Sequence, residues 1–329
     1  MRRTILAVLL AAASLAASAC TNYGGDLSGG AGLAAGRGSA DGLRQIKVMD
    51  TAGMPSAFLT YGVQRGYFRA EGLDVRMQTS AGGAAAIPAL VNGGLDVAGS
   101  NVVSAVIAMN RGLPVRMVGS GTSTSTDPER DFSGLVVPAG SPIRSAADLV
   151  GKKVAVNTLR NINDIVIDAS MRKAGAAAPN ARYVEMGFPD MAPALERGDV
   201  DAAMLIEPFL TTAVGKGMRV VGRPYSDTRH GLQIGTFLMA AAKAREQPEL
   251  VSAFQAGVRR TAESIARDPD AFRAALPKIA GFAPALAAKI NLPGWNGTTD
   301  RASVELIASS MRRLGLTDEP FDYDKGVLK

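Results

Sequence analysis

Short β-type runs alternate with stretches of helical periodicity through most of the chain. Between residues 45 and 120 the runs are QIKVM, LDVRM, LDVAGS and VRMVGS, and Ala-rich helical patterns occur at 58–65, 84–91 and 102–111. Strands that are separated by helices along the chain usually lie parallel in one sheet, with the helices on its faces. The pattern therefore predicts an α/β fold with a mostly parallel sheet flanked by helices.

A second set of strand candidates begins near Gly134 and predicts a second sheet. Its runs are GLVVP, KKVAVN, ARYVEM, DAAMLI and RVVG, again with helical patterns between them. GTFLMAAAKA at 235–244 predicts one more strand. Residues 248–314 show helical periodicity only, and apolar positions such as Val251, Phe254 and Val258 indicate helices that pack on the first sheet.

Two segments of the first set recur in the second. ERGDVDAAMLIEP at 196–208 repeats the pattern of VNGGLDVAGSNVV at 91–103, and DLVGKKVAVN at 148–157 repeats that of DGLRQIKVMD at 41–50. Either recurrence alone is compatible with chance, because βα segments share a common composition. Together and in the same order they favour two similar βα lobes in one chain.

The loops after the predicted strands are rich in Gly, Ser, Thr and Asn. In open α/β sheets ligands bind beyond the carboxyl ends of the strands, where helix N-termini present free N–H groups. Two lobes that face each other there would form a cleft suited to a small polar or anionic molecule. The alternative is that Ser80, Ser100, Asn101 and Asn161 are ordinary N-caps and that Gly82 serves a turn.

Two charged residues in these loops allow two interpretations each. Arg160 precedes a helix expected from Asn161, where the helix dipole already places positive charge, so a nearby anion would stabilise it. That anion is either a ligand or the carboxylate of Asp164. Glu207 ends an apolar strand, and it could bind a ligand amine or cap the helix that begins at Pro208.

The N-terminal segment locates the protein. Residues 1–20 have a basic start, an apolar run and small residues, in the order of an export signal. The single cysteine, Cys20, stands where a bacterial lipoprotein signal places the residue to be lipidated, with Ala17 in place of the usual leucine; an ordinary signal peptide is the alternative. Residues 21–44 are rich in Gly, Ser and Ala, and this composition predicts a flexible tether. We therefore expect an extracytoplasmic, lipid-anchored protein, in a periplasm or on the outer face of the plasma membrane.

Composition argues against several other functions. The net charge of +6 comes from scattered Lys and Arg, which disfavours nucleic-acid binding. With one histidine, His230, and one cysteine, the chain has no two-histidine metal site, and it has no GxSxG or HExxH motif. We expect no metal, no cofactor and no catalytic residues. The alternatives are an enzyme of the same fold that acts on a small metabolite, and a lipid-anchored interaction protein.

Several motifs, in this order, resemble those of a known family: YGVQRGYFRAEGLDV, ALVNGGLDVAGSN, VPAGSPIRSAADLVGKKVAVN, ALERGDVDAAMLIEPF and GTFLMAA. They resemble the extracytoplasmic solute-binding proteins of bacterial ABC importers, in the branch for sulfonates, taurine, nitrate and thiamine-precursor pyrimidines. The resemblance implies a two-lobed periplasmic-binding-protein type II fold joined by two crossover strands. Lobe one would comprise 45–135 plus 240–329 and lobe two 136–239, with the hinge near 132–136 and 233–238. Such a protein is expected to be a monomer that delivers its solute to the permease subunits of an ABC transporter.

The resemblance also implies a set of ligand contacts. They are Met54, Ser80, Gly82, Ser100, Asn101, Thr122, Asn157, Arg160, Asn161 and Glu207. Where many members have an aromatic residue before the acidic residue and proline, this chain has Ile206, and its cleft loops offer few aromatics beyond Phe58, Phe188 and Phe209. Stacking of a flat ring is thus less favoured, and a small aliphatic sulfonate, carboxylate or other anion is favoured in comparison.

Overall fold

The computed structural model describes residues 42–328. The expected signal peptide, Cys20 and all of the expected tether except residues 42–44 lie outside the described residues. Arg44, the last residue assigned to the tether, already belongs to the first strand. Among the described helices, none combines the length and the apolar character needed to span a bilayer.

The first sheet has the strand order β2-β1-β3-β11-β4. Its strands are β1 (Arg44–Thr51), β2 (Leu73–Ser80), β3 (Val97–Asn101), β4 (Val115–Ser120) and β11 (Gly235–Ala240). β1 pairs in parallel with β2 and β3, whereas β11 runs antiparallel to β3 and β4. Alternation along β1 buries Ile46, Val48 and Asp50. We call this sheet with its helices the first lobe.

The second sheet has the strand order β10-β6-β9-β7-β8. Its strands are β6 (Ser133–Val137), β7 (Lys153–Val156), β8 (Arg182–Glu185), β9 (Ala202–Ile206) and β10 (Arg219–Gly222). β7 pairs in parallel with β8 and β9, and β6 is antiparallel to β9 and β10. The continuous apolar run AAMLI suits β9, which is buried along its whole length. We call this sheet with its helices the second lobe.

The recurring sequence segments have matching structural roles. In the first lobe Asp96 accepts a hydrogen bond from Lys47 N through its Oδ2 at 2.7 Å, just before β3 and beside β1. In the second lobe Asp201 accepts the same bond from Lys153 N at 2.8 Å, just before β9 and beside β7. The order β2-β1-β3-β11 thus corresponds to β8-β7-β9-β6, with the antiparallel strand at the same place in both sheets.

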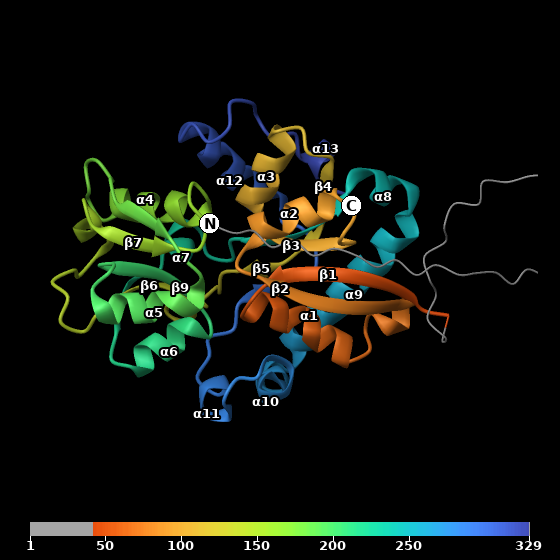
Figure 1. Ribbon diagram of the computed structural model, residues 1–329, viewed down its shortest axis with the longest axis horizontal. Helices are drawn as coiled ribbons and strands as arrows, with labels where there is room; N and C mark the ends of the chain where they lie inside the picture. Colours follow the sequence, from red (N-terminus) through yellow and green to blue (C-terminus); the bar gives the residue numbers. More distant parts are fainter. Residues whose placement is uncertain (1–41, 329) are drawn as a thin grey trace, which may run out of the picture. The chain divides into compact units, whose positions relative to one another are not determined.

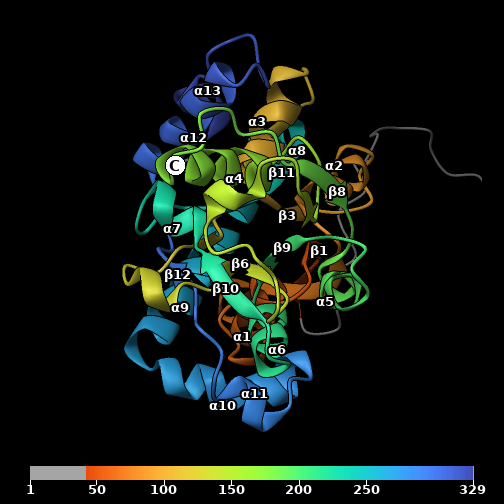
Figure 2. The ribbon, with the colours of Figure 1, turned by 90° about the vertical axis from the view of Figure 1, so that its left-hand side faces the viewer.

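Helices cover both faces of each sheet (Figures 1 and 2). In the first lobe α1 (Met54–Gln64), α9 (Pro248–Arg267) and α10 (Pro269–Ala280) pack on one face, and α2 (Gly83–Val91), α3 (Val102–Asn110) and α12 (Arg301–Arg313) on the other. In the second lobe α4 (Ile162–Lys173) and α7 (Pro224–Thr228) lie opposite α5 (Phe188–Arg197) and α6 (Phe209–Gly215). Short elements are α8 (Ala241–Glu246), α11 (Pro284–Ala287), α13 (Tyr323–Gly326), η1 (Arg69–Glu71), η2 (Pro128–Arg130), η3 (Ala146–Leu149), β5 (Thr122–Ser123) and β12 (Gly294–Trp295).

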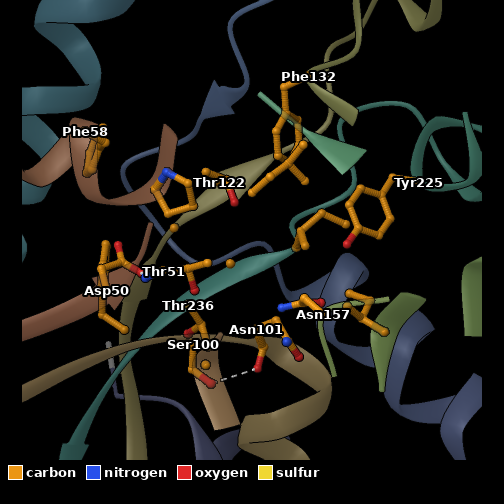
Figure 3. Close-up of a pocket in the computed structure, with 18 of the residues that line it drawn as sticks. Asp50, Thr51, Phe58, Ser100, Asn101, Thr122, Phe132, Asn157, Tyr225 and Thr236 are labelled. Atoms are coloured by element: carbon orange, nitrogen blue, oxygen red, sulfur yellow. Dashed lines mark hydrogen bonds between the residues drawn. The ribbon is translucent and has the colours of Figure 1, made fainter. Parts of the chain in front are cut away.

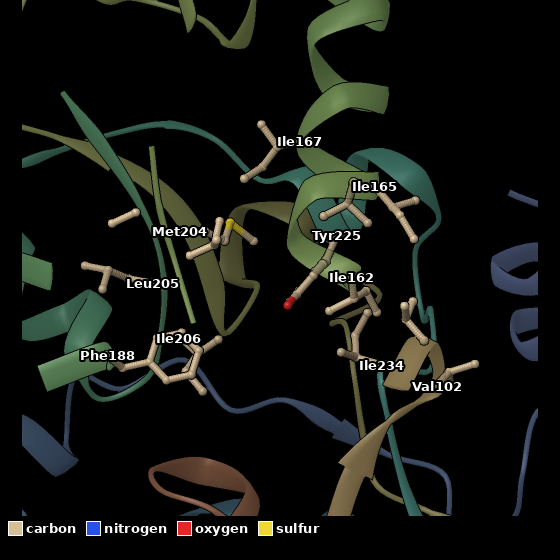
Figure 4. Packing of buried hydrophobic residues seen from close by; sticks show 14 of the residues in the cluster. Val102, Ile162, Ile165, Ile167, Phe188, Met204, Leu205, Ile206, Tyr225 and Ile234 are labelled. Atoms are coloured by element: carbon tan, nitrogen blue, oxygen red, sulfur yellow. The ribbon is translucent and has the colours of Figure 1, made fainter. Parts of the chain in front are cut away.

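Buried apolar side chains form two clusters among the described residues. One fills the space between the first sheet and α1, α9 and α10. The other begins on the α2 and α3 face of the first sheet and continues through the second lobe. Figure 4 shows Val102 of α3 near Ile162 of α4 and Ile234, which precedes β11. Apolar packing therefore continues from one lobe to the other.

Two segments connect the sheets, 121–132 between β4 and β6, and 223–234 between β10 and β11. They run side by side, because Ile234 N donates to Thr122 O and Thr124 N donates to Leu232 O, each at 2.9 Å. The lobe boundaries expected at 135/136 and 239/240 fall inside β6 and β11, and the expected hinge segments overlap these strands. In the structure the whole of β6 belongs to the second sheet and the whole of β11 to the first, so both crossings between the sheets lie N-terminal to the expected boundaries. An apolar run by itself does not indicate which sheet a buried strand joins.

Candidate ligand-binding site

A cavity lies where the carboxyl ends of β1, β3 and β7 meet the two connecting segments. Both lobes line it (Figure 3). Its volume is about 60 Å³, whereas a site for a single water has roughly 10–15 Å³, so the cavity suits a small molecule.

Four of the residues expected from the sequence line this cavity: Ser100, Asn101, Thr122 and Asn157. Ser100 and Asn101 end β3, and the Asn101 side chain also caps α3 by accepting from Ser104 N at 2.9 Å. Thr122 belongs to β5, in the connecting segment. Asn157 follows β7. They present hydroxyl and amide groups, which donate and accept hydrogen bonds without carrying charge.

The other six expected contacts do not line the cavity. Met54 is fully buried in the core below α1, and the Ser80 hydroxyl donates to Gly82 O at 3.2 Å. Arg160 has a left-handed backbone with φ of 50°, and its N–H donates to Asp164 Oδ2 at 2.8 Å. The exposed Arg160 side chain borders a separate surface groove that also includes Arg111. The arginine expected to face an anion therefore lies outside this cavity.

Asn161, Gly82 and Glu207 instead lie where the lobes touch. Asn161 Oδ1 accepts from Ile162 N at 2.8 Å, and its Nδ2 donates across the lobes to Ser104 Oγ at 2.9 Å. Gly82 packs so closely on the second lobe that an added Cβ would lie 2.7 Å from Asn157 Nδ2. Asn161 and Gly82 therefore form contacts between the two lobes and do not line the cavity.

Glu207 is a fully buried carboxylate with a capping role. Its Oε2 accepts from Thr211 N at 3.0 Å at the start of α6, and its Oε1 accepts from Asn291 N at 3.1 Å. Its carbonyl oxygen accepts from Met54 N at 3.3 Å, at the start of α1. Burial raises the pKa of Glu207, and the hydrogen bonds from Thr211 and Asn291 oppose this shift. The structure thus has the capping arrangement foreseen as one of two alternatives, with added bonds to the segments at Met54 and Asn291.

Aromatic side chains supply much of the cavity wall. Among the described residues, those that line it are Phe58, Phe132, Phe188, Tyr225, Phe237 and Trp295. The rings of Phe58 and Trp295 stack with centroids 5.1 Å apart and planes at 15°. The expectation of an aromatic-poor cleft was wrong, because it considered only the loops after parallel strands. The four added rings are Phe132 of a connecting segment, Tyr225 of α7, Phe237 of β11 and Trp295 of β12. β12 pairs with β5 and so brings Trp295 beside Thr122.

Asp50 is the one carboxyl group on the cavity wall among the described residues. It is 4% exposed, and its Oδ1 accepts from Thr51 N at 2.7 Å. Burial raises its pKa to about 7, and the Thr51 hydrogen bond opposes the shift. Figure 3 shows it on the same side as Phe58, across from Tyr225. Asp50 is not among the contacts expected from the sequence, although its alternation with the buried Ile46 and Val48 of β1 indicates burial.

A family model described as NMT1/THI5 like matches residues 55–272, which is more than half of the chain. The chain belongs to the NMT1/THI5-like family. This agrees with the resemblance to solute-binding proteins that the motifs indicated, since structures of such proteins are also similar to it. The alkanesulfonate-binding protein SsuA from Xanthomonas axonopodis pv. citri, solved with bound MOPS, superposes with a TM-score of 0.72 at 18% identity, covering 90% of this chain and 99% of SsuA.

That superposition confirms the predicted fold class, an α/β fold with two lobes of the periplasmic-binding-protein kind. Two curated relatives match at sequence level. The chain is 27% identical over 175 residues to a putative aliphatic sulfonates-binding protein of Escherichia coli K12, covering 53% of this chain and 51% of that protein. It is 25% identical over 165 residues to a 4-amino-5-hydroxymethyl-2-methylpyrimidine phosphate synthase of Schizosaccharomyces pombe, covering 50% and 45%. The chain thus spans about half the length of the curated relatives it matches.

Proposed function

We propose that this member of the NMT1/THI5-like family is the extracytoplasmic solute-binding component of an ABC importer. It captures a small organic solute between its lobes and delivers the solute to a permease. The observation that carries this proposal is the small cavity enclosed by both lobes, with polar and aromatic side chains converging on it. As part of the same proposal, Cys20 carries a lipid that anchors a monomeric protein to the membrane.

The mechanism follows from the contacts between the lobes. Three hydrogen bonds join them: Asn161 Nδ2 to Ser104 Oγ at 2.9 Å, Asn157 Nδ2 to Ala81 O at 3.4 Å, and Met54 N to Glu207 O at 3.3 Å. In an open state these groups would be hydrated. A solute that contacts both lobes binds the closed state better and shifts the population toward it. The paired stretches of the connecting segments, 122–124 and 232–234, would act as the hinge.

Within the cavity we propose Ser100, Asn101, Thr122 and Asn157 as solute contacts. α2 begins beside them at Gly83, which lines the cavity, and no side chain caps this helix. Its free N–H groups would suit an acceptor group of the solute. The aromatic walls suit an apolar or flat body, which supports a ring-bearing solute such as a pyrimidine.

An enzyme is the second candidate function, because one curated relative bears the name of a synthase. His230, considered from the sequence as a base, is exposed and does not line the cavity. Asp50 is placed in the cavity and has a pKa near neutrality, as a general acid or base would require. The two functions differ in the fate of the solute, because a receptor returns it unchanged.

The single tryptophan of the chain provides the assay. Since Trp295 lines the cavity, its fluorescence should change when a solute enters. We would screen sulfonates, nitrate, carboxylates, pyrimidines and amines by fluorescence and thermal shift, then test compaction by small-angle scattering. A receptor should show saturable quenching or enhancement, a higher melting temperature and compaction, with the solute recovered intact by mass spectrometry. Conversion of the solute would favour the enzyme, and saturating binding without compaction would contradict the hinged mechanism.

A further inference from the structure

We infer that the solute carries a protonated nitrogen and that Asp50 recognises it, so that the site takes a small organic cation, such as a protonated amine or amidine. The body of this cation lies against the aromatic wall. The inference rests on the proposed function, and it names the substrate class that the cavity selects.

The Asp50 carboxylate is held in place at the cavity wall. It stands at the end of β1, where it is 4% exposed and accepts a backbone hydrogen bond from Thr51. The carboxylate packs directly over Gly99 of β3, and a Cβ at Gly99 would collide with it. Because the side chain is already fixed, its carboxylate can accept a further hydrogen bond from a ligand with little additional loss of conformational entropy.

The cavity supplies no positive side chain to balance this carboxylate. Among the described residues, no Lys, Arg or His lines the cavity, and no ion pair includes Asp50. A buried carboxylate without a counter-charge is unfavourable, and a ligand cation that donates a hydrogen bond to it removes that cost. A sulfonate or nitrate ion at this wall would add like charge.

The aromatic residues beside Asp50 extend the same argument. Phe58 lines the cavity on the side of Asp50 and stacks on Trp295, whose other neighbour Phe272 meets it edge-on at 5.4 Å. Ring faces attract cations, and the attraction grows when the cation is desolvated. Carboxylate and rings together therefore favour a cation with an apolar body over a neutral polar solute.

The pH dependence of binding follows from the surroundings of Asp50. Tyr225 is the other ionisable side chain on the cavity wall among the described residues, and α2 carries none. α1 carries Tyr61 and is followed by Arg65, and the carbonyl oxygen of Glu207 lies at the start of α1. Lys47 N donates to Asp96 toward the opposite end of β1, β1 itself also carries Arg44, and the neighbouring strand β2 carries Asp74 and Arg76. In the empty protein burial raises the pKa of Asp50 to about 7.

A cation binds the ionised carboxylate, so binding below that pH must release the proton of Asp50. Affinity should therefore rise by up to about tenfold per pH unit between pH 5 and 7 and level off above it. A solute that accepts a hydrogen bond from protonated Asp50 would instead bind with constant affinity well below pH 7 and lose affinity as the pH rises through 7. The sign of the pH dependence thus separates the two modes of recognition.

The experiment uses the full-length protein and calorimetric titration. The probes are ethylamine to pentylamine and benzamidine, each compared with the corresponding alcohol or amide and with alkanesulfonates of equal length. The variants are Asp50→Asn and, as matched control, Asp168→Asn. Asp168 is a half-buried carboxylate of α4 that accepts from Tyr183 Oη at 2.6 Å and does not line the cavity.

We expect amines or amidines to bind at least tenfold more tightly than their neutral and anionic counterparts, with affinity rising toward pH 7. Asp50→Asn should weaken this binding at least tenfold and remove the pH dependence, and Asp168→Asn should change neither. Equal or tighter binding of alcohols or sulfonates, or affinity that rises as pH falls in the wild type, would overturn the inference and leave solute binding intact. Binding by no probe of any class would count against the proposed function itself.

Discussion

Ser104→Ala should weaken solute binding more than it weakens the fold. Ser104 lies in α3 of the first lobe, is 4% exposed and accepts from Asn161 Nδ2 of the second lobe at 2.9 Å. The alanine leaves the Asn161 amide buried without this partner in the closed state only. In an open state water would hydrate both groups, so the variant affects the closure equilibrium.

The size of the effect follows from the cost of an unsatisfied buried donor. That cost is about 1–3 kcal/mol, and we take about 1–2 kcal/mol because a water can partly replace the lost hydroxyl. If closure is required for tight binding, the apparent dissociation constant rises by the same free energy, roughly five- to thirtyfold. The melting temperature of the protein without solute should change little, because the open state remains folded.

Ser170→Ala is the matched control. Ser170 is 3% exposed and donates to Asp227 Oδ2 at 2.7 Å, and both residues belong to the second lobe. This variant should lower the melting temperature and leave affinity unchanged. Tryptophan fluorescence titration gives the affinity and calorimetry gives the melting temperature. Equal losses of affinity in the two variants, or a loss of stability alone in Ser104→Ala, would refute the reasoning.

Three further predictions test the site. Gly82→Ala should weaken binding about tenfold in the same titration, because its methyl group meets Asn157 and resists closure; Gly140→Ala, with open space around it, should have no effect. Asp50→Asn should reduce the pH dependence of stability, because Asp50 holds its proton up to pH about 7 in the folded state and only to about 4 in the unfolded chain. Between pH 4 and 7 the wild type should therefore lose a few kcal/mol more than the variant in urea denaturation, and equal losses would contradict the assignment. Arg160→Ala should leave affinity unchanged, because the side chain lies outside the cavity; a tenfold loss for an anionic solute would instead support the role expected from the sequence.

The two-lobed α/β architecture was predictable from the amino-acid sequence alone. Hydrophobic periodicity fixes which segments become strands and helices, because it reflects local burial and backbone hydrogen bonding. The recurring aspartates Asp96 and Asp201 accept the same bond in each lobe, so the repeat recognised in the sequence reports a shared local structure. Ser100, Asn101 and Asn157 were expected near a ligand because they stand at the carboxyl ends of strands, and the cavity lies at those ends.

The identity of the other side chains around these residues depends on long-range packing, which no local pattern encodes. Trp295 reaches the cavity because β12 pairs with β5, which lies far away in the sequence. The neighbouring contact from Asn296 to Ser123, for example, joins residues that are 173 positions apart. Periodicity placed Asp50 on a buried face, but whether a cation would accompany it depended on segments far away in the chain. Glu207 had two possible roles until packing set Thr211 and Asn291 against its carboxylate. A local pattern encodes burial, whereas the partner of a buried polar group is set by long-range packing.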